Sequence, residues 1–395
     1  MNIDILSAVV FYSLLFLFYA KYKKRFVTQG KIFVLYKTKF GLKLMDRFSK
    51  VCPRIAKFFG DVGILVGFAG MATMFYILLK GTYNLIFVPK TVPIVSPVLP
   101  GIQIPGLPAL SFWHWIISIF VVALVHEFSH GIYARLSNVK IKSSGFAFLG
   151  PILAAFVEPD ENQLNKKKKR EQLRLFAAGP FGNIVLFLVV FLVAGFIVNP
   201  LVASSMEYQG VKVISIEADS PVSETNIAVD DNIIGINDVT ISNLDDFLNA
   251  TQNLKPGDNV LVKTGREDYT LELTARPDDS NRGYMGVSVT PISVGFKPDY
   301  VDKYGNGLLS FFLWFSKLLF WIYVISFGIG LFNLLPLGPI DGGRMFHTAL
   351  LFFTKNEKKA KHIWGIVSFI CLALIVINLL PYILKVLISI FNLFV

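Results

Sequence analysis

The most informative part of this sequence is a five-residue segment with two histidines and one glutamate, His126-Glu127-Phe128-Ser129-His130. On a helix, His126 and His130 lie one turn apart on the same face, so both can bind one metal ion. Glu127 points about 100° away from His126, where it can act on a metal-bound water without being a ligand. The spacing predicts a hydrolytic zinc site, with a chance five-residue match as the alternative.

The residues around this segment are those of a membrane span. An almost unbroken apolar stretch runs from Trp115 to Val125, directly before His126. Ionisable side chains are costly at membrane depth, so they usually mark a functional site. A chance match at this place would bury costly groups without any benefit, which favours the metal site.

The composition is that of a protein that crosses a membrane several times. Of the 395 residues, 54% are hydrophobic and 37 are phenylalanine. A spanning helix needs roughly 20 apolar residues, and suitable runs occur near residues 4–20, 60–80, 112–135, 173–200, 308–335 and 363–380. We therefore expect a polytopic α-helical membrane protein with about six spans. Pro381 and Lys385 leave it open whether the last span continues as a kinked helix or a seventh, short element follows.

The charges are distributed unevenly along the chain, whose net charge is +11. Residues 203–304 contain 17 Asp or Glu and 8 Lys or Arg, whereas basic residues gather in 21–57, 166–170 and 355–361. The positive-inside rule predicts that these three basic segments are cytoplasmic and that residues 203–304 lie outside. Because the basic residues adjoin the spans, they indicate topology and anionic lipid, and no nucleic-acid partner is expected.

The first apolar run is expected to be a signal anchor of a multi-pass protein in the cell membrane. It lacks a preceding basic region and a small-x-small cleavage site, and its basic cluster follows it. Cys52 and Cys371 are far apart in the sequence and form no metal-binding or disulfide pattern. Both are therefore expected to be isolated thiols.

The spans and the charges divide the chain into four regions. Residues 1–58 form the first span and a basic, partly amphipathic segment that we expect to lie along the inner membrane surface. Residues 59–204 and 293–395 form the two parts of the membrane core. Between them, residues 205–292 are expected to form a small inserted α/β domain. Its strands are expected at 211–216, 232–236, 259–264 and 269–273, its turns at 219–221, 256–258 and 281–283, and its helix at 244–253, capped by Asn243.

Two segments of the membrane core are too irregular to be spanning helices. Residues 92–109 contain five prolines and are expected to form an external loop or hairpin. Residues 145–157 are apolar, short and broken by Gly and Pro, and we expect an unpaired strand that lines a membrane cavity. Such a strand could bind an extended substrate by strand addition, or the segment could be a buried re-entrant loop.

A catalytic zinc ion needs a third protein ligand and an open position for water. His114 lies about 18 Å along the same helix from His126, too far to share the site, and His347 and His362 are expected near the cytoplasmic rim. Asp341 is the better candidate, because it follows the fifth span in a segment that Gly and Pro residues break. The alternative is that Asp341 is only a turn residue, since Asp-Gly is a common turn pair.

Three motifs together resemble the site-2-protease family of intramembrane zinc metalloproteases: His126–Gly131, Ala178–Asn183 and Asn333–Arg344. The resemblance implies that one zinc ion per chain is held by His126, His130 and Asp341, with Glu127 as the general base.

The same resemblance makes Asn183 a candidate for stabilising the oxyanion or positioning the substrate. The third motif departs from the family, which often has Asn-Pro-x-x-Asp-Gly at this turn. Here Leu337 and Gly338 precede Pro339, so the asparagine is absent from the turn. This difference affects the expected role of the motif in positioning the substrate. It does not affect the assignment of Asp341 as a ligand.

Residues 205–292 resemble a PDZ domain of the type found in bacterial proteases. The likeness is carried by Ser220-Pro221, Asp231–Asp238, Leu244–Phe247 and Gly283–Val287. It implies a loop whose N–H groups bind a peptide C-terminus, formed by Gly283, Tyr284, Met285, Gly286 and Val287. The alternative is a domain that only blocks access to the active site sterically.

The family resemblance implies hydrolysis of peptide bonds in or near the transmembrane segments of membrane-protein substrates, as in regulated intramembrane proteolysis. The active site would lie toward the cytoplasmic side, and the PDZ-like domain would be extracytoplasmic. The alternatives are a metal transporter, which could use the same three ligands as a transit site, and a non-catalytic membrane scaffold. A transporter would need neither Glu127 nor an external peptide-binding domain.

Overall fold

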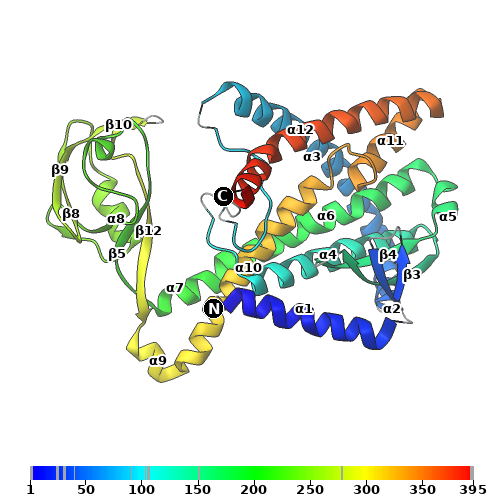
Figure 1. The fold of residues 1–395 in the computed structure, drawn as a ribbon, viewed down its shortest axis with the longest axis horizontal. Coiled ribbons are helices and arrows are strands. Elements are labelled where there is room, and N and C mark those ends of the chain that lie inside the picture. Colours follow the sequence, from blue (N-terminus) through cyan, green and yellow to red (C-terminus); the bar gives the residue numbers. More distant parts are fainter. Residues whose placement is uncertain are drawn as a thin grey trace. The chain divides into compact units, whose positions relative to one another are not determined.

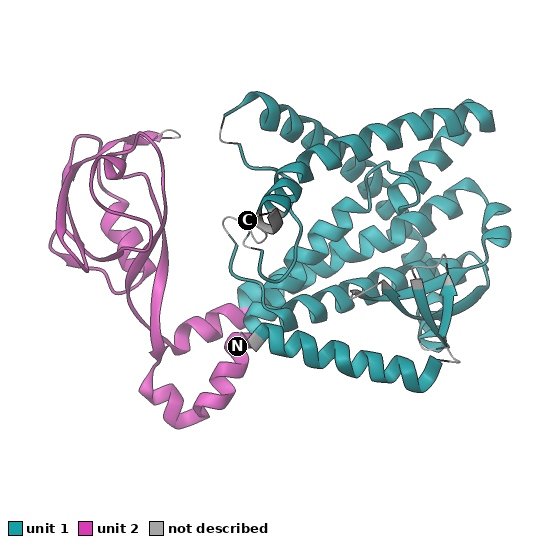
Figure 2. Cartoon of the chain, in the orientation of Figure 1, with its two compact units in different colours: residues 1–196, 315–395 teal, residues 197–314 magenta. Residues whose placement is uncertain are grey.

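The computed structural model describes residues 3–23, 26–29, 33–39, 41–89, 91–102, 104, 107–149, 152–276 and 279–391. The chain forms two compact units (Figure 2): unit 1 is Met1–Phe196 with Phe315–Val395, and unit 2 is Ile197–Trp314. Unit 1 is mainly long helices with one small sheet, whereas unit 2 is rich in strands (Figure 1).

Within the described residues, six helices are long and apolar enough to cross a membrane. They are α1 (Ile3–Tyr22), α3 (Pro53–Phe87), α4 (Phe112–Leu136), α6 (Lys169–Val193), α10 (Asn306–Phe332) and α12 (Glu357–Phe391). The polytopic membrane protein with about six spans is thus confirmed. α6 continues through a π-helical turn, Ala194–Val198, into α7 (Asn199–Ser205).

The last span is one helix rather than two elements. α12 runs through Pro381 to Phe391, so residues 381–391 extend the sixth span and form no separate seventh. Residues 392–395 lie outside the described part. The shorter helices of unit 1 are α2 (Leu42–Val51), α5 (Glu161–Asn165) and α11 (Asp341–Thr354).

The proline-rich segment before α4 is irregular, as expected. The described residues between 92 and 109 contain no helix or strand, and Pro105 lies outside them. Trp115 Nε1 on α4 donates a hydrogen bond of 2.9 Å to the carbonyl oxygen of Val98. This bond fastens the loop to the start of α4.

Glycines allow close packing around α4, the helix that carries the histidine pair. Gly182 on α6 lies so close to Ser129 that a β-carbon at position 182 would overlap the serine side chain. Gly131 on α4 lies in the same way against Met45 of α2. Small residues let spanning helices approach one another closely, and here they bring both α6 and α2 onto α4.

The segments before α2 and after α4 contain strands. Within 21–58, β1 (Phe26–Gln29) and β2 (Phe33–Thr38) precede α2, and the placement of this segment along the inner membrane surface stays a prediction. The expectation of an unpaired strand at 145–157 is wrong, because the described residues of this segment belong to β3 (Ile141–Leu149) and β4 (Ile152–Pro159), which pair antiparallel.

These four strands form one antiparallel sheet in the order β1-β2-β3-β4. The physical reason is that buried backbone N–H and C=O groups need partners. β2 supplies them to β3 across a long stretch of sequence, with Leu35 opposite Ala147. Of β3 and β4, only β4 is at an edge of the sheet, so strand addition to a substrate is geometrically possible there.

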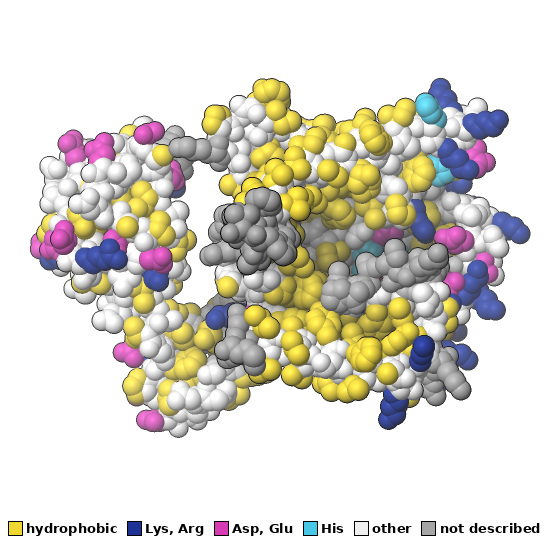
Figure 3. Space-filling model, in the orientation of Figure 1, with side chains coloured by type: hydrophobic (Ala, Val, Ile, Leu, Met, Phe, Trp, Pro, Cys, Tyr) yellow, Lys and Arg dark blue, Asp and Glu magenta, His cyan; other side chains and the backbone are white. Residues whose placement is uncertain are grey.

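The surface of unit 1 suits a bilayer. Figure 3 shows hydrophobic side chains spread over its helices, with Lys and Arg side chains gathered beside α5 and the start of α12. Many large apolar side chains are exposed, including Phe196 and Phe369, which are 77% and 72% accessible. An apolar surface this extensive is expected where lipid replaces water.

Unit 2 contains a twisted antiparallel sheet with the strand order β12-β5-β6-β8-β9, and β7 pairs with β6. The bounds of these strands are β5 (Met206–Ile216), β6 (Asn232–Ile236), β7 (Val239–Thr240), β8 (Asn259–Thr264), β9 (Asp268–Glu272) and β12 (Val287–Phe296). A separate pair is formed by β10 (Thr274–Arg276) and β11 (Asp279–Tyr284). The helices of unit 2 include α7, a 3₁₀ turn at Pro221–Glu224, α8 (Leu244–Thr251) and α9 (Pro298–Tyr304).

The predicted elements of this small α/β domain are largely confirmed. All four expected strands are present, and the Asn243 side chain caps α8 by accepting a hydrogen bond of 2.9 Å from Asp246 N. The apolar core includes Val211, Ile233 and Phe247. The turn expected at 281–283 is wrong, because these residues belong to β11.

Candidate metal centre

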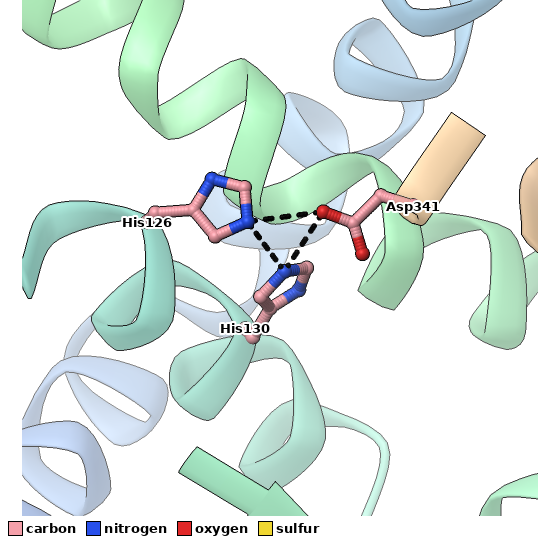
Figure 4. Close-up of side chains that lie close together, drawn as sticks. All are labelled: His126, His130 and Asp341. Carbon is pink, nitrogen blue, oxygen red and sulfur yellow. Dashed lines mark hydrogen bonds and ion pairs between the residues drawn. The ribbon is translucent and has the colours of Figure 1, made fainter. Parts of the chain in front are cut away.

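Three side chains from two distant parts of unit 1 meet at one point. His126 and His130 lie on α4, and Asp341 is the first residue of α11. Asp341 Oδ2 is 3.0 Å from His126 Nε2 and 3.2 Å from His130 Nε2, and the two Nε2 atoms are 3.2 Å apart. Figure 4 shows these three atoms facing one another. The expected pairing of the histidines with Asp341 is therefore present in the structure.

These separations fit a tetrahedral zinc ion. Zinc–ligand bonds of about 2.0–2.1 Å place two ligand atoms about 3.3 Å apart in a tetrahedron, close to the separations seen here. One oxygen and two imidazole nitrogens are a common donor set for catalytic zinc, and three protein ligands leave a fourth position for water.

The backbone of Gly179 on α6 forms one wall of this centre. A β-carbon at position 179 would lie 2.5 Å from His126 Nε2 and would also meet His130 Nε2. Only glycine therefore leaves room beside the ligand atoms for an ion. This role could not be inferred from the residue type, because the residue acts through the absence of a side chain.

The interruption between α10 and α11 positions Asp341 beside the two histidines. Gly342 N donates a hydrogen bond of 2.7 Å to the carbonyl of Asn333, which folds the segment back on the end of α10. A β-carbon at Gly342 would overlap the backbone of Leu334, and one at Gly343 would overlap that of Leu337. The two glycines after Asp341 are therefore required by the close backbone approach.

Both histidines are held by hydrogen bonds on the ring nitrogen that faces away from the centre. His130 Nδ1 is 2.8 Å from the carbonyl oxygen of Leu175, which can only accept, so Nδ1 carries the proton. The lone pair of His130 Nε2 is then free for a metal. Partners of this kind fix the tautomer and the orientation of a metal-binding histidine.

Asn183 holds His126 in the corresponding way. Its side-chain amide is 3.1 Å from His126 Nδ1, it is fully buried, and its other amide atom, Oδ1, has no partner among the described residues. Exchanging the amide oxygen and nitrogen lets Oδ1 accept a hydrogen bond from Nδ1–H, which leaves Nε2 free for a metal. Asn183 thus contacts the side of the His126 ring that faces away from the ligand cluster.

The Glu127 side chain lies beside the metal centre and reaches from α4 to the edge strand β4. Its Oε2 accepts a hydrogen bond of 2.9 Å from Val157 N on β4. A cavity of about 270 Å³ is lined by Glu127, the three clustered side chains and Arg344. The carboxylate can therefore act on a water molecule in this cavity.

The remaining histidines of the sequence lie outside the cluster that the described residues form. His114 is buried near the start of α4, with Nδ1 2.5 Å from Ser111 Oγ. His347 packs its ring on Trp364, and burial lowers the pKa of its imidazole. The expectation that His114 does not share the site agrees with this geometry.

The segment Gly283–Val287 is packed within unit 2. Gly283 N donates a hydrogen bond of 2.8 Å to the carbonyl of Leu254, so this N–H group already has a partner. Gly283 and Tyr284 end β11 and Val287 begins β12. Met285 and Gly286 connect the two strands, and Gly286 has a positive φ of 80° next to Ser220.

Comparison with known proteins gives consistent similarities. The model of Peptidase family M50 matches residues 114–375, a range that includes both histidines and Asp341. An uncharacterized protein of Methanocaldococcus jannaschii is 31% identical over 323 residues, which are 80% of this chain and 77% of the relative. The zinc metalloprotease RasP of Oceanobacillus iheyensis is 22% identical over 237 residues, 49% of this chain and 54% of the relative.

Among solved structures, a match was found to the PDZ domain of the SdrC-like protein from Listeria monocytogenes. The identity is 23%, the match covers 21% of this chain and 88% of that domain, and the TM-score is 0.19.

Proposed function

Because this chain belongs to peptidase family M50, we propose that His126, His130 and Asp341 hold its catalytic zinc ion and that Glu127 is its general base. The protein is an intramembrane zinc metalloprotease. The observation that supports the residue assignment is the convergence of two Nε2 atoms and one Oδ2 atom within 3.2 Å, although His130 and Asp341 are 211 positions apart.

A bound zinc ion would supply Lewis acidity, polarising the scissile carbonyl and lowering the pKa of water toward about 7. Glu127 accepts the proton of the attacking water and returns it to the leaving amine. The hydrogen bond from Val157 N to Glu127 Oε2, 2.9 Å long, orients this carboxylate and leaves Oε1 for the water. Asn183 and the Leu175 carbonyl keep the two imidazole rings in place.

The proposed substrates are membrane proteins whose transmembrane segments enter the site in an extended form. A helix hides its carbonyl groups in its own hydrogen bonds, so it must unwind before cleavage. The edge strand β4 offers such a peptide a partner next to Glu127, because Val157 N points away from β3 and toward the site. Strand addition at β4 would place the scissile bond near the metal centre.

We place the active site toward the cytoplasmic side and the inserted domain outside, as the positive-inside rule predicts. Within that domain, Met285, Gly286 and the start of β12 are the candidate contacts for a peptide C-terminus, because Gly283 N already has a partner. Steric control of access is the alternative role.

The test compares cleavage with transport in one preparation. Purified protein in liposomes, with a single-span substrate and a lumenal zinc indicator, should cleave the substrate in a zinc-dependent way and give no zinc flux. Zinc flux without cleavage would indicate a transporter, and neither activity in the metal-loaded protein would indicate a scaffold.

A further inference from the structure

We propose that unit 1 binds the phosphate group of an anionic phospholipid in a basic hollow between α2, α3 and the loop after α4. The hollow has a volume of about 600 Å³, and its wall includes Lys50, Lys57, Arg135, Lys140 and Asp46. It is separate from the metal cavity, with which it shares no lining residue.

The charges in this basic hollow are left unbalanced. Asp46 is already paired with Arg135, whose Nε lies 2.9 Å from Asp46 Oδ1. Lys50, Lys57 and Lys140 form no ion pair with a carboxylate in the part of the chain that the structure describes. Three cations from three different segments thus surround one hollow, where they would attract a compact anion.

The start of α3 adds to the attraction for an anion. Pro53, the first residue of this 35-residue helix, lines the hollow, and Cys52 before it makes no side-chain capping bond. The first turn of α3 contains no acidic residue. An uncapped helix N-terminus carries free N–H groups and a partial positive charge, which favour a phosphate group beside the lysines.

Exposed apolar side chains close in sequence to the lysines favour a lipid over free phosphate. Phe48 and Val51 on α2 and Phe58 on α3 are 54%, 66% and 63% accessible. Each of them lies within two positions of Lys50 or Lys57 in the sequence, so acyl chains would contact them while the phosphate meets the lysines. One phospholipid can contact both the lysines and the apolar side chains, whereas inorganic phosphate can contact only the lysines.

Occupation of the hollow would stabilise the helix that carries the histidines. α2 packs on α4 through Met45 against Gly131 and through the rings of Phe48 and Phe128, whose centroids are 5.8 Å apart. The pair Asp46–Arg135 joins the same two helices. A phosphate that holds Lys50 and Lys140 would therefore hold α2 against the loop that follows α4, the helix of His130.

Native mass spectrometry can test the site directly. The full-length protein is released from micelles that contain equal amounts of phosphatidylglycerol and phosphatidylcholine, and retained lipid is counted. Wild type should retain phosphatidylglycerol preferentially, and the triple variant Lys50→Gln, Lys57→Gln, Lys140→Gln should lose about tenfold or more of this preference. The matched control Lys166→Gln, Lys358→Gln, Lys359→Gln removes the same charge elsewhere and should keep it.

Equal retention by the triple variant and wild type would overturn the proposal, and so would an equal loss in the matched control. Competition with inorganic phosphate separates the two sources of the anion. Displacement of the lipid by millimolar phosphate would contradict a lipid site, whereas retention supports it. A zinc content equal to that of wild type will show that the triple variant is folded.

Discussion

Gly179 of α6 lies against His126 at the point where the three candidate ligands meet. A β-carbon at position 179 would be 2.5 Å from His126 Nε2 and 2.6 Å from His126 Cε1. The smallest possible side chain would thus compete with the metal for space.

We therefore expect Gly179→Ala to lower the zinc affinity at least about tenfold, although alanine is otherwise favoured in helices. Zinc per chain, measured by elemental analysis after dialysis against a graded chelator, checks this. Gly195→Ala is the matched control, because a β-carbon there has no neighbour within 4 Å in the described residues. An unchanged affinity in Gly179→Ala would show that the ion does not lie beside this residue.

Glu127→Gln should keep the zinc ion and lose the activity. The amide keeps the size of the side chain but cannot accept a proton, and general-base catalysis typically contributes about 10²–10⁴-fold to a rate. Cleavage of a single-span substrate and zinc content are measured on the same preparation. Glu171→Gln, the same change at the start of α6, should leave both unchanged. Retained proteolysis in Glu127→Gln would remove the residue from the role of base.

Asn183→Ala should weaken zinc binding, because it removes the partner of His126 Nδ1 at 3.1 Å. Loss of such a partner typically costs about 10–100-fold in metal affinity. Asn183→Asp, which keeps an acceptor oxygen, should restore part of it. If Asn183 instead acted only on the oxyanion, cleavage would fall in Asn183→Ala while the zinc affinity stayed at the wild-type value.

A buried polar pair should stabilise the packing of α12 on α3. Asn378 Nδ2 donates a hydrogen bond of 2.6 Å to Thr82 Oγ1, and both side chains are buried. A double-mutant cycle with Asn378→Ala and Thr82→Ala should give a coupling of about 1 kcal/mol in the free energy of unfolding. Unfolding in mixed micelles measures it. Additivity of the two single changes within about 0.3 kcal/mol would argue against an energetic role for the bond.

Much of the architecture could be predicted because the signals are local. Apolar runs of spanning length located the six helices, and the Asn243 cap marked the start of α8. His126, Glu127 and His130 fall within about one turn of a helix. The glycines and prolines around Asp341 indicate that the helix is interrupted there. The proximity of His130 and Asp341 could be predicted because isolated ionisable side chains are costly inside a membrane.

Other features could not be predicted, because they depend on distant partners. The pairing of Leu35 with Ala147 joins strands that share no local signal, so the sequence predicts neither β1 and β2 nor the pairing of β3 with β4. Gly179 has no side chain from which a role could be inferred. For Asn183, the family motif indicated the neighbourhood of the site, whereas its contact with His126 Nδ1 depends on how α6 packs on α4.

Zinc content of purified wild type beside Asp341→Ala tests the central claim most directly. The geometry predicts one tightly bound zinc ion per chain in wild type and in Glu127→Gln, and loss of tight binding in Asp341→Ala, because only two ligands remain. Equal, tight zinc in wild type and Asp341→Ala would contradict the metal centre described here.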